Sequence, residues 1–339
     1  MRFGAQYLPT YVPTLDGPIP EFYQRMLQQI ETLDALGYDD VWMTEHHFFE
    51  YGGTVPDPAV FLAAAAGRTT RIRLGIAVVV LPLRNPIHVA ETYAMLDVIS
   101  NGRLEFGIAR GSTPAEFDGF GIDYAESAAR MREAMTIVRK AWTGDTVTYQ
   151  GEFYNIPGVR VLPKPLQQPH PPVWVGVANS DESFRWAGAS GFHLMTLPYL
   201  YDPAETHARI NLYREATAGA GHDLAAKEVL GKFHVYVSES AAAARDEAGP
   251  FLSNYYDLAN AREGGKMEGV AALRSFDTQL ARGSIIAGDP ARCIDNLNFW
   301  IERLGLTTIS GNFHFGGMPQ ELALKNIRLF AEKVMPAFQ

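Results

Sequence analysis

The chain has 339 residues, 47% of them hydrophobic and 20% charged, so it has a globular composition and enough length to bury a large core. Its net charge of -9 argues against a nucleic-acid partner, because a phosphate backbone attracts basic surfaces. The longest apolar run, Ile76–Leu83, is far shorter than the roughly 20 residues that span a bilayer. The N-terminal MRFGAQYL lacks the pattern of a secretion signal, so we expect a cytoplasmic protein without a membrane span.

Short β-branched or aromatic segments alternate along the chain with longer segments of helical period, and eight such pairs can be counted. The predicted strands are Arg2–Leu8, Asp40–Glu45, Ile72–Leu81, Arg103–Ala109, Val173–Ala178, Phe192–Leu197, Val229–Val237 and Thr307–Asn312. The predicted helices lie near Pro20–Leu36, Pro58–Gly67, Ile87–Ser100, Ala125–Trp142, Asp181–Gly188, Ala204–Gly219, Pro290–Leu304 and Pro319–Val334. Eight βα units close most economically into a barrel, so residues 1–339 are predicted to form one α/β domain, a (β/α)8 TIM barrel. An open, doubly wound sheet is the alternative.

Residues at several predicted helix ends support these assignments. The dipeptides Asp57-Pro58 and Asp289-Pro290 each combine an N-cap with a proline at the first helical position, where the missing N–H is not needed. Gly305 follows a predicted helix, as a left-handed C-cap would.

Two segments interrupt the βα alternation. Gly144–Pro172 contains six prolines and a hairpin pattern, and we interpret it as an insertion between the fourth helix and the fifth strand. Ala259–Arg282 is rich in glycine near its middle and precedes the eighth unit. A mobile lid and a plain surface loop are equally compatible with this second segment.

The common phosphate motifs GxGxxG and GxxxxGK[ST] are absent, which argues against a nicotinamide cofactor bound by a Rossmann unit. Cys293 is the only cysteine, so the chain has no intrachain disulfide and no thiolate cluster for a metal ion.

Two adjacent histidines, His46 and His47, follow the second predicted strand. The C-terminal strand ends of a barrel form its active-site face, which makes the pair a candidate for chemistry. If the strand continued this far, its alternation would turn the two rings to opposite faces, which argues against joint chelation of a metal ion. A metal site, a structural pair, and a general base or hydrogen-bond donor all stay open. We favour the base or donor, and predict no metal, because imidazole exchanges protons near neutral pH.

A second candidate site joins the ends of the fourth and fifth strands. Arg110 and Gly111 place a fixed charge beside a backbone that a ligand can approach closely. The fifth strand leads to Asn179 and Ser180 just before a helix, with Ser183 in the first turn. Backbone N–H groups and serine hydroxyls at a helix start can hold a phosphate, and an arginine on the neighbouring strand can neutralise it.

Four segments together resemble the bacterial luciferase family of flavin-dependent monooxygenases, over nearly the whole chain. They are EHHF at Glu45–Phe48, GIAVVVLPLRNPIHVAE at Gly75–Glu91, LDVISNGRLEFGIARG at Leu96–Gly111 and GDPARCIDNL at Gly288–Leu297. The resemblance is greater to the luciferase catalytic subunit than to members that use a deazaflavin.

The resemblance implies a (β/α)8 barrel that binds reduced FMN at its C-terminal mouth and reacts it with O2 to a C4a-hydroperoxide. One oxygen atom then enters a small organic substrate. His46 matches the family's catalytic histidine, and Ala77 and Val78 match a pair joined by a cis peptide beneath the flavin ring. The positions matching the family's phosphate-binding residues are Arg110, Asn179, Ser180 and Ser183.

Two positions depart from the luciferase pattern. Ala109 stands where luciferase has a reactive cysteine, and Thr113 replaces an aromatic residue, so light emission is not implied. Because this chain lacks a nicotinamide-binding motif, a separate flavin reductase is expected to supply reduced FMN in a transient encounter. A deazaflavin-dependent oxidoreductase and a catalytically silent flavin-binding homologue are the alternatives.

The resemblance also implies a homodimer through the second and third helices, where Phe61–Gly67 offers small side chains for close packing. Several aromatic and apolar residues suggest a chamber for a small apolar substrate such as an aldehyde. They are Tyr7, Met43, Phe48, Phe49, Tyr51, Phe117, Phe120, Tyr199 and Phe313.

Overall fold

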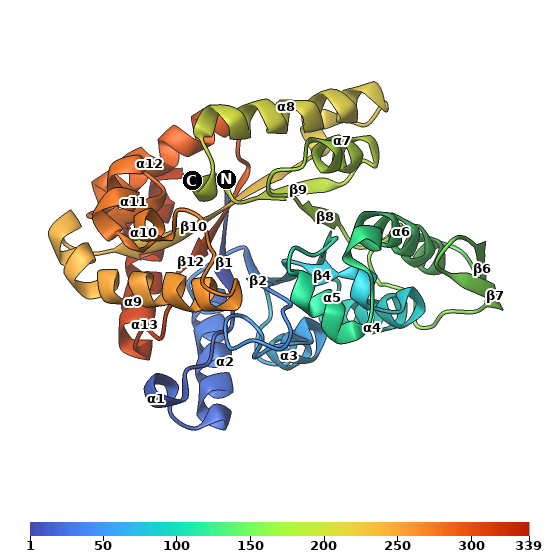
Figure 1. The fold of residues 1–339 in the computed structure, drawn as a ribbon, viewed down its shortest axis with the longest axis horizontal. Helices are drawn as coiled ribbons and strands as arrows, with labels where there is room; N and C mark the ends of the chain where they lie inside the picture. Colours follow the sequence, from blue (N-terminus) through green and yellow to red (C-terminus); the bar gives the residue numbers. More distant parts are fainter. Residues whose placement is uncertain (339) are drawn as a thin grey trace.

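The computed structural model describes residues 1–338 and confirms the (β/α)8 barrel (Figure 1). Eight strand positions run parallel around the barrel in the order β12, β1, β2, β3, β5, β8, β9 and β10, and the pairing of β9 with β10 closes it. The strands are β1 (Arg2–Tyr7), β2 (Asp40–Met43), β3 (Arg73–Ile76), β5 (Leu104–Ala109), β8 (Val173–Gly176), β9 (His193–Thr196), β10 (Val229–Val237) and β12 (Thr308–Asn312). The open-sheet alternative is therefore wrong.

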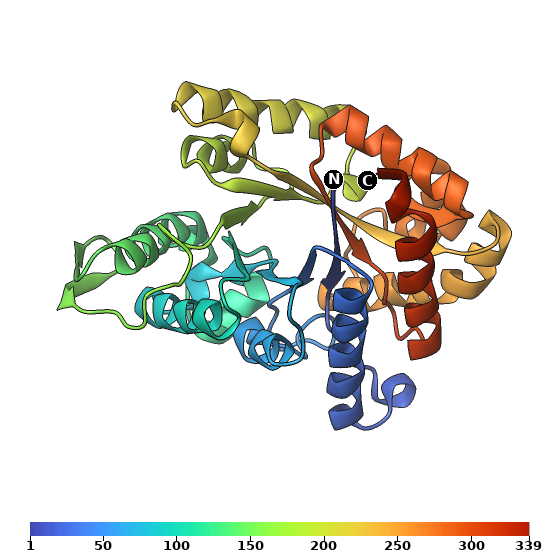
Figure 2. The same ribbon diagram turned by 180° about the vertical axis from the view of Figure 1, so that it is seen from behind.

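Helices cover the outside of the barrel, as the same ribbon seen from behind also shows (Figure 2). The longer ones are α2 (Ile19–Ala35), α3 (Pro58–Ala66), α4 (Pro86–Ile99), α6 (Ser127–Thr143), α7 (Asp181–Ala189), α8 (Pro203–Gly219), α9 (Ala241–Arg262), α12 (Pro290–Leu304) and α13 (Gln320–Lys333). Asp57 and Asp289 accept backbone N–H bonds as N-caps, and Gly305 is left-handed, as predicted. No helix within residues 1–338 is long and apolar enough to cross a membrane.

The insertion Gly144–Pro172 contains the predicted hairpin, formed by β6 (Val147–Gln150) and β7 (Asn155–Val159). Ala259–Arg282, in contrast, is mostly helical, so the loop prediction is wrong for most of its length. The end of α9 is followed by α10 (Val270–Arg274) and α11 (Phe276–Arg282). The glycines that suggested a long loop occupy only the turn between α9 and α10, whereas the apolar spacing beyond them suits helices.

Two strands differ from the prediction. The third predicted strand is divided, because β3 ends at Ile76 and a short β4 (Val79–Val80) resumes pairing with β5. An additional strand, β11 (Ile285–Gly288), pairs with the second half of β10, beyond the point where β9 ends. Four residues before a helix cap are too short a run to be distinguished from a loop by alternation alone.

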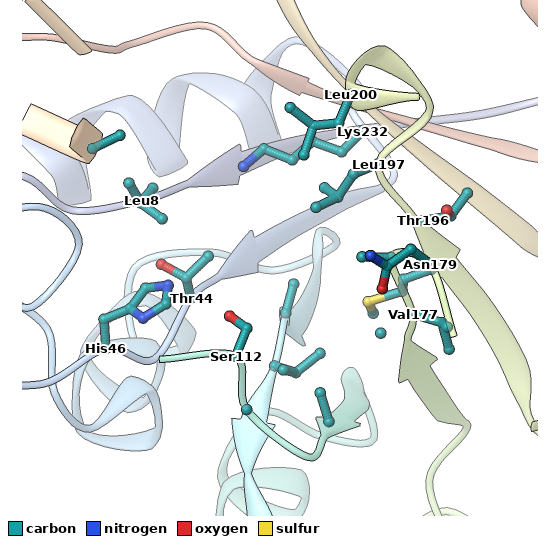
Figure 3. Close-up of a pocket in the computed structure, with 18 of the residues that line it drawn as sticks. Leu8, Thr44, His46, Ser112, Val177, Asn179, Thr196, Leu197, Leu200 and Lys232 are labelled. Carbon is teal, nitrogen blue, oxygen red and sulfur yellow. The ribbon is translucent and has the colours of Figure 1, made fainter. Parts of the chain in front are cut away.

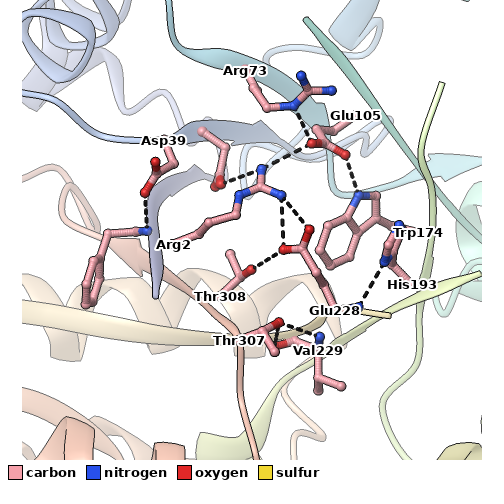
Figure 4. Close-up of polar contacts among 12 residues, drawn as sticks. Arg2, Asp39, Arg73, Glu105, Trp174, His193, Glu228, Val229, Thr307 and Thr308 are labelled. Atoms are coloured by element: carbon pink, nitrogen blue, oxygen red, sulfur yellow. Dashed lines mark hydrogen bonds and ion pairs between the residues drawn. The ribbon is translucent and has the colours of Figure 1, made fainter. Parts of the chain in front are cut away.

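Charged side chains close the N-terminal end of the barrel (Figure 4). Arg2 pairs with Asp40 at 3.0 Å, Glu105 at 3.1 Å and Glu228 at 3.0 Å. Burial raises the pKa of Asp40 to about 7, although the Arg2 charge opposes the rise. Above this layer, Trp42 and Trp174 pack edge to face with their centroids 5.3 Å apart. Side chains thus fill the N-terminal half of the barrel, and a large cavity lies towards its C-terminal end.

Candidate active site

A cavity of about 800 Å³ lies at the C-terminal ends of the barrel strands, where residues following β2, β3, β5, β8 and β9 form its wall (Figure 3). It brings together every residue predicted to react with or bind the cofactor. These are His46, Ala77, Val78, Arg110, Gly111, Asn179, Ser180 and Ser183. Segments more than 100 residues apart in sequence therefore converge on one space, and their individual roles stay predictions.

The arginine end of the cavity has the chemistry of an anion site. Arg110 makes no hydrogen bond or ion pair within residues 1–338, and its guanidinium lies 5.8 Å from the ring centroid of Tyr124. Ser180 is the N-cap of α7, where its hydroxyl accepts the Ser183 N–H at 3.3 Å and the Ser183 hydroxyl at 3.1 Å. An acidic neighbour is Glu182 in the first turn of α7, whose pKa the Arg132 and Arg110 charges lower. An arginine with no hydrogen bond or ion pair of its own, beside a helix N-terminus, fits a phosphate group.

Gly111 lets the backbone turn beside Arg110. Its φ is +83°, and a Cβ placed there would lie only 2.8 Å from the Phe117 ring and 2.9 Å from Val80. A larger residue would therefore require both strain and repacking at this wall of the cavity.

The peptide bond between Ala77 and Val78 is cis, as the resemblance implies. It divides β3 from β4, and the two side chains pack against Trp42 and Trp174. The cis unit thus lies on the aromatic floor and forms part of the cavity wall.

His46 is held by Glu116, a buried carboxylate on α5 (Pro114–Phe120), the short helix that follows β5. Its Nδ1 lies 3.0 Å from Glu116 Oε1, which also accepts the His47 backbone N–H at 3.0 Å. Burial alone would raise the pKa of Glu116, but the hydrogen bond and charge of His46, with the His47 N–H, lower it below its ordinary value. An ionised carboxylate only accepts hydrogen bonds, so the proton of neutral His46 belongs on Nδ1 and Nε2 is left free to accept one.

The His47 ring makes different contacts from the His46 ring. Its Nε2 lies 3.1 Å from Glu45 Oε1, and Arg84 donates to the same oxygen at 2.8 Å. The ring also packs edge to face on Phe120 at 4.8 Å and does not line the cavity. No group of three or more His, Cys, Asp or Glu side chains in residues 1–338 is arranged to hold a metal ion.

The sequence did not point to Glu116 or Lys232, although both line the cavity. A lysine in the largely apolar β10 sequence VLGKFHVYV is the signal that could have indicated Lys232. Strand alternation places it on the face opposite Phe233. Of the nine residues expected to form an apolar chamber, Tyr51 and Tyr199 line the cavity. Thr44, Thr196, Tyr255 and Tyr256 accompany them, so the wall is more polar than predicted.

The barrel and its C-terminal cavity define a (β/α)8 protein whose chemistry is expected at the strand ends. The profile of the luciferase-like monooxygenase family matches residues 1–308, and the chain belongs to that family. The resemblance noted in the sequence is thereby confirmed.

A curated relative, the oxygenase component of a flavin-dependent trigonelline monooxygenase from Acinetobacter baylyi, is 30% identical over 94% of this chain and 90% of its own. The solved monooxygenase RslO1 from Streptomyces bottropensis is 32% identical with a TM-score of 0.91, and 100% of each chain is covered. The coenzyme F420 dependent tetrahydromethanopterin reductase from Methanopyrus kandleri has a TM-score of 0.76 at 20% identity, covering 100% of this chain and 99% of its own, which shows a shared fold.

Proposed function

We propose that this chain is the oxygenase of a two-component system. It takes reduced FMN from a separate flavin reductase and uses O2 to oxidise a small organic substrate with a largely apolar body, such as an aldehyde. The trigonelline relative, described as flavin-dependent and as an oxygenase component, supports this division of labour. Reduced FMN supplies the two electrons that activate O2. For an aldehyde, the balanced products are the carboxylic acid, water and oxidised FMN.

The unpartnered Arg110 guanidinium at the cavity wall is the observation that supports flavin binding most directly. It lies on the loop after β5, and Ser180 begins α7 after the neighbouring β8, so a single phosphate can engage both. Asn179 and Ser183 would add neutral hydrogen-bonding groups, and Gly111, which lines the cavity without a side chain, allows close approach of a ligand to its backbone. The Ala77–Val78 unit provides a flat wall for the flavin ring.

His46 is proposed to move a proton during oxygen transfer. Glu116 fixes the ring and its tautomer, and His46 lines the cavity, so Nε2 is the proposed exchanging atom. General acid-base assistance of this kind typically contributes roughly 100- to 10,000-fold in rate.

An oxygen-mixing experiment tests the proposed function. The protein is titrated anaerobically with reduced FMN and then mixed with O2, with and without an aldehyde such as decanal, while flavin absorbance and product are followed. The expected result is tight binding, a trace unlike that of free reduced FMN, and product in proportion to flavin oxidised. Oxidation identical to that of free flavin would show a silent homologue, and hydride transfer to a deazaflavin without O2 would show the other alternative.

We also propose a homodimer that pairs through α3 and α4. Four large apolar residues on these two helices are exposed, at 72%, 50%, 46% and 52% of their surface. They are Val60, Met95, Val98 and Ile99. Burying them against a second copy would remove this apolar surface from water.

A further inference from the structure

A buried cation, Lys232, enters the cavity without a counterion in the described chain. Its side chain lines the cavity from the middle of β10, only 4% of the residue is exposed, and no carboxylate within residues 1–338 pairs with it. In Figure 3 the side chain extends from β10 into the cavity, with the ammonium group on the side of Leu8.

The alternation of β10 explains this position. Side chains on a strand point to opposite faces in turn. Leu230 packs with Trp42 in the barrel floor, and Lys232, two residues further on, faces the cavity. Phe233, on the other face, packs against Trp300 of α12 with centroids 5.4 Å apart. The same alternation therefore directs Lys232 into the barrel and Phe233 towards the surrounding helices.

An unpaired ammonium is unfavourable in this environment. Burial alone lowers the pKa of Lys232 to about 8, and no opposite charge counters the effect. His234, the next inward residue of β10, has a pKa well below its ordinary value because of burial and the Lys232 charge. Lys232 anchors no other part of the described chain, so a structural role does not explain its retention. A bound ligand that brings an anion would supply the missing partner.

We propose that Lys232 binds a carboxylate group of the substrate. This inference concerns the substrate of the proposed oxygenase and therefore rests on that function. It assigns the substrate an acidic end in addition to the largely apolar body that is oxidised.

The position of Lys232 separates it from the proposed flavin-binding groups. In the strand order, β10 lies opposite β3, so Lys232 extends from the side of the barrel facing the Ala77–Val78 unit. The anion end formed by Arg110 and Ser180 belongs to the β5 and β8 loops and has its own positive charge. A flavin held between those two features leaves the Lys232 side of the cavity for the substrate.

Unpartnered hydroxyl groups support a polar ligand in the same space. Thr44, Thr196 and Tyr256 all line the cavity, and their buried hydroxyls have no hydrogen-bond partner within residues 1–338. Buried polar atoms normally find partners, so these groups are available to a substrate oxygen.

Binding of matched acids and amides tests the proposal. The wild-type protein loaded with oxidised FMN is titrated with hexanoate, benzoate and 4-formylbenzoate, and with the neutral amide of each, by calorimetry. At least one acid is expected to bind at least about tenfold more tightly than its amide, because hydrogen bonds to charged groups are roughly twice as strong as neutral ones. Lys232→Met removes this preference, Lys232→Arg retains it, and Lys227→Met, which removes a charge outside the cavity, leaves it unchanged.

The titrations distinguish the possible outcomes as follows. No acid preferred by the wild type, or a preference that survives Lys232→Met, overturns the proposal. The flavin midpoint potential is measured in parallel, and a potential lowered by Lys232→Met without loss of acid preference would assign the ammonium to reduced flavin instead. Acid preference in a protein that fails the oxygen-mixing experiment supports the Lys232 site and overturns the oxygenase function. Oxygenation without acid preference supports the oxygenase function and overturns the Lys232 site.

Discussion

Replacing Lys232 with Met is expected to stabilise the folded protein by about 3 kcal/mol at pH 7. Burial lowers the pKa of this lysine from 10.5 to about 8. Each unit of pKa difference corresponds to about 1.36 kcal/mol. The unfolded chain therefore holds the proton more tightly than the folded protein, and the charged lysine opposes folding. Methionine has a similar length and no charge, so it removes this opposition without leaving a large hole.

The dependence on pH has a definite sign. The unfavourable contribution is fully present below pH 8, diminishes between pH 8 and 10.5, and vanishes above 10.5, where the lysine is neutral in both states. The stabilisation by Lys232→Met should therefore fall to about 1 kcal/mol at pH 10.

Equilibrium urea unfolding at pH 7 and pH 10 measures both values. For a chain of this length, about 3 kcal/mol also corresponds to a rise of about 4 °C in Tm. Lys227→Met, at a position outside the cavity, serves as the control and should change stability by less than about 0.5 kcal/mol. A variant no more stable than wild type at pH 7, or equally stabilised at both pH values, would refute the reasoning.

Four further substitutions test the proposed function and the proposed dimer. Arg110→Ala should weaken reduced-FMN binding by about 1.5–3 kcal/mol and riboflavin binding much less, whereas equal losses would show that Arg110 does not meet the phosphate. His46→Ala should slow single-turnover oxidation roughly 100-fold or more and change the FMN affinity by no more than a few-fold, and an active His46→Ala protein would contradict the mechanism. His47→Ala should mainly lower Tm. Val60→Glu should convert the proposed dimer to a monomer, with a mass of 37.4 kDa measured by light scattering. A variant that stays dimeric would show that α3 is not the interface.

The barrel could be predicted because its signals are local. Alternating apolar segments, the Asp57-Pro58 cap and the glycine at 305 each specify their own part of the chain, and eight repetitions leave few closed arrangements. The errors occur where local signals are weak or misleading. Four residues of β11 are a strand only because the free edge of β10 is available to them, and glycines confined to one turn hid α10 and α11.

The site was predicted in part for the same reason. Residues at the ends of strands β2, β5 and β8 could be assigned to one face of the barrel from chain position alone. Glu116 could not, because its contact with His46 links residues 70 positions apart and depends on how the β5 loop folds. The expected apolar chamber failed similarly, since aromatic residues such as Phe313 and Phe117 pack into the protein interior, which the sequence does not distinguish from a cavity wall.

The two ends of the cavity differ in how they are built. The proposed flavin end combines the Arg110 and serine side chains with backbone features, namely the Gly111 turn, the start of α7 and the cis unit. The opposite end depends on single side chains projecting from β10, and one inward position can change from apolar to charged without altering the strand. Lys232 occupies such a position at a cost to stability, because nothing in residues 1–338 compensates its charge. Substrate choice in this chain is therefore expected to follow from a few cavity-facing residues on β9 and β10.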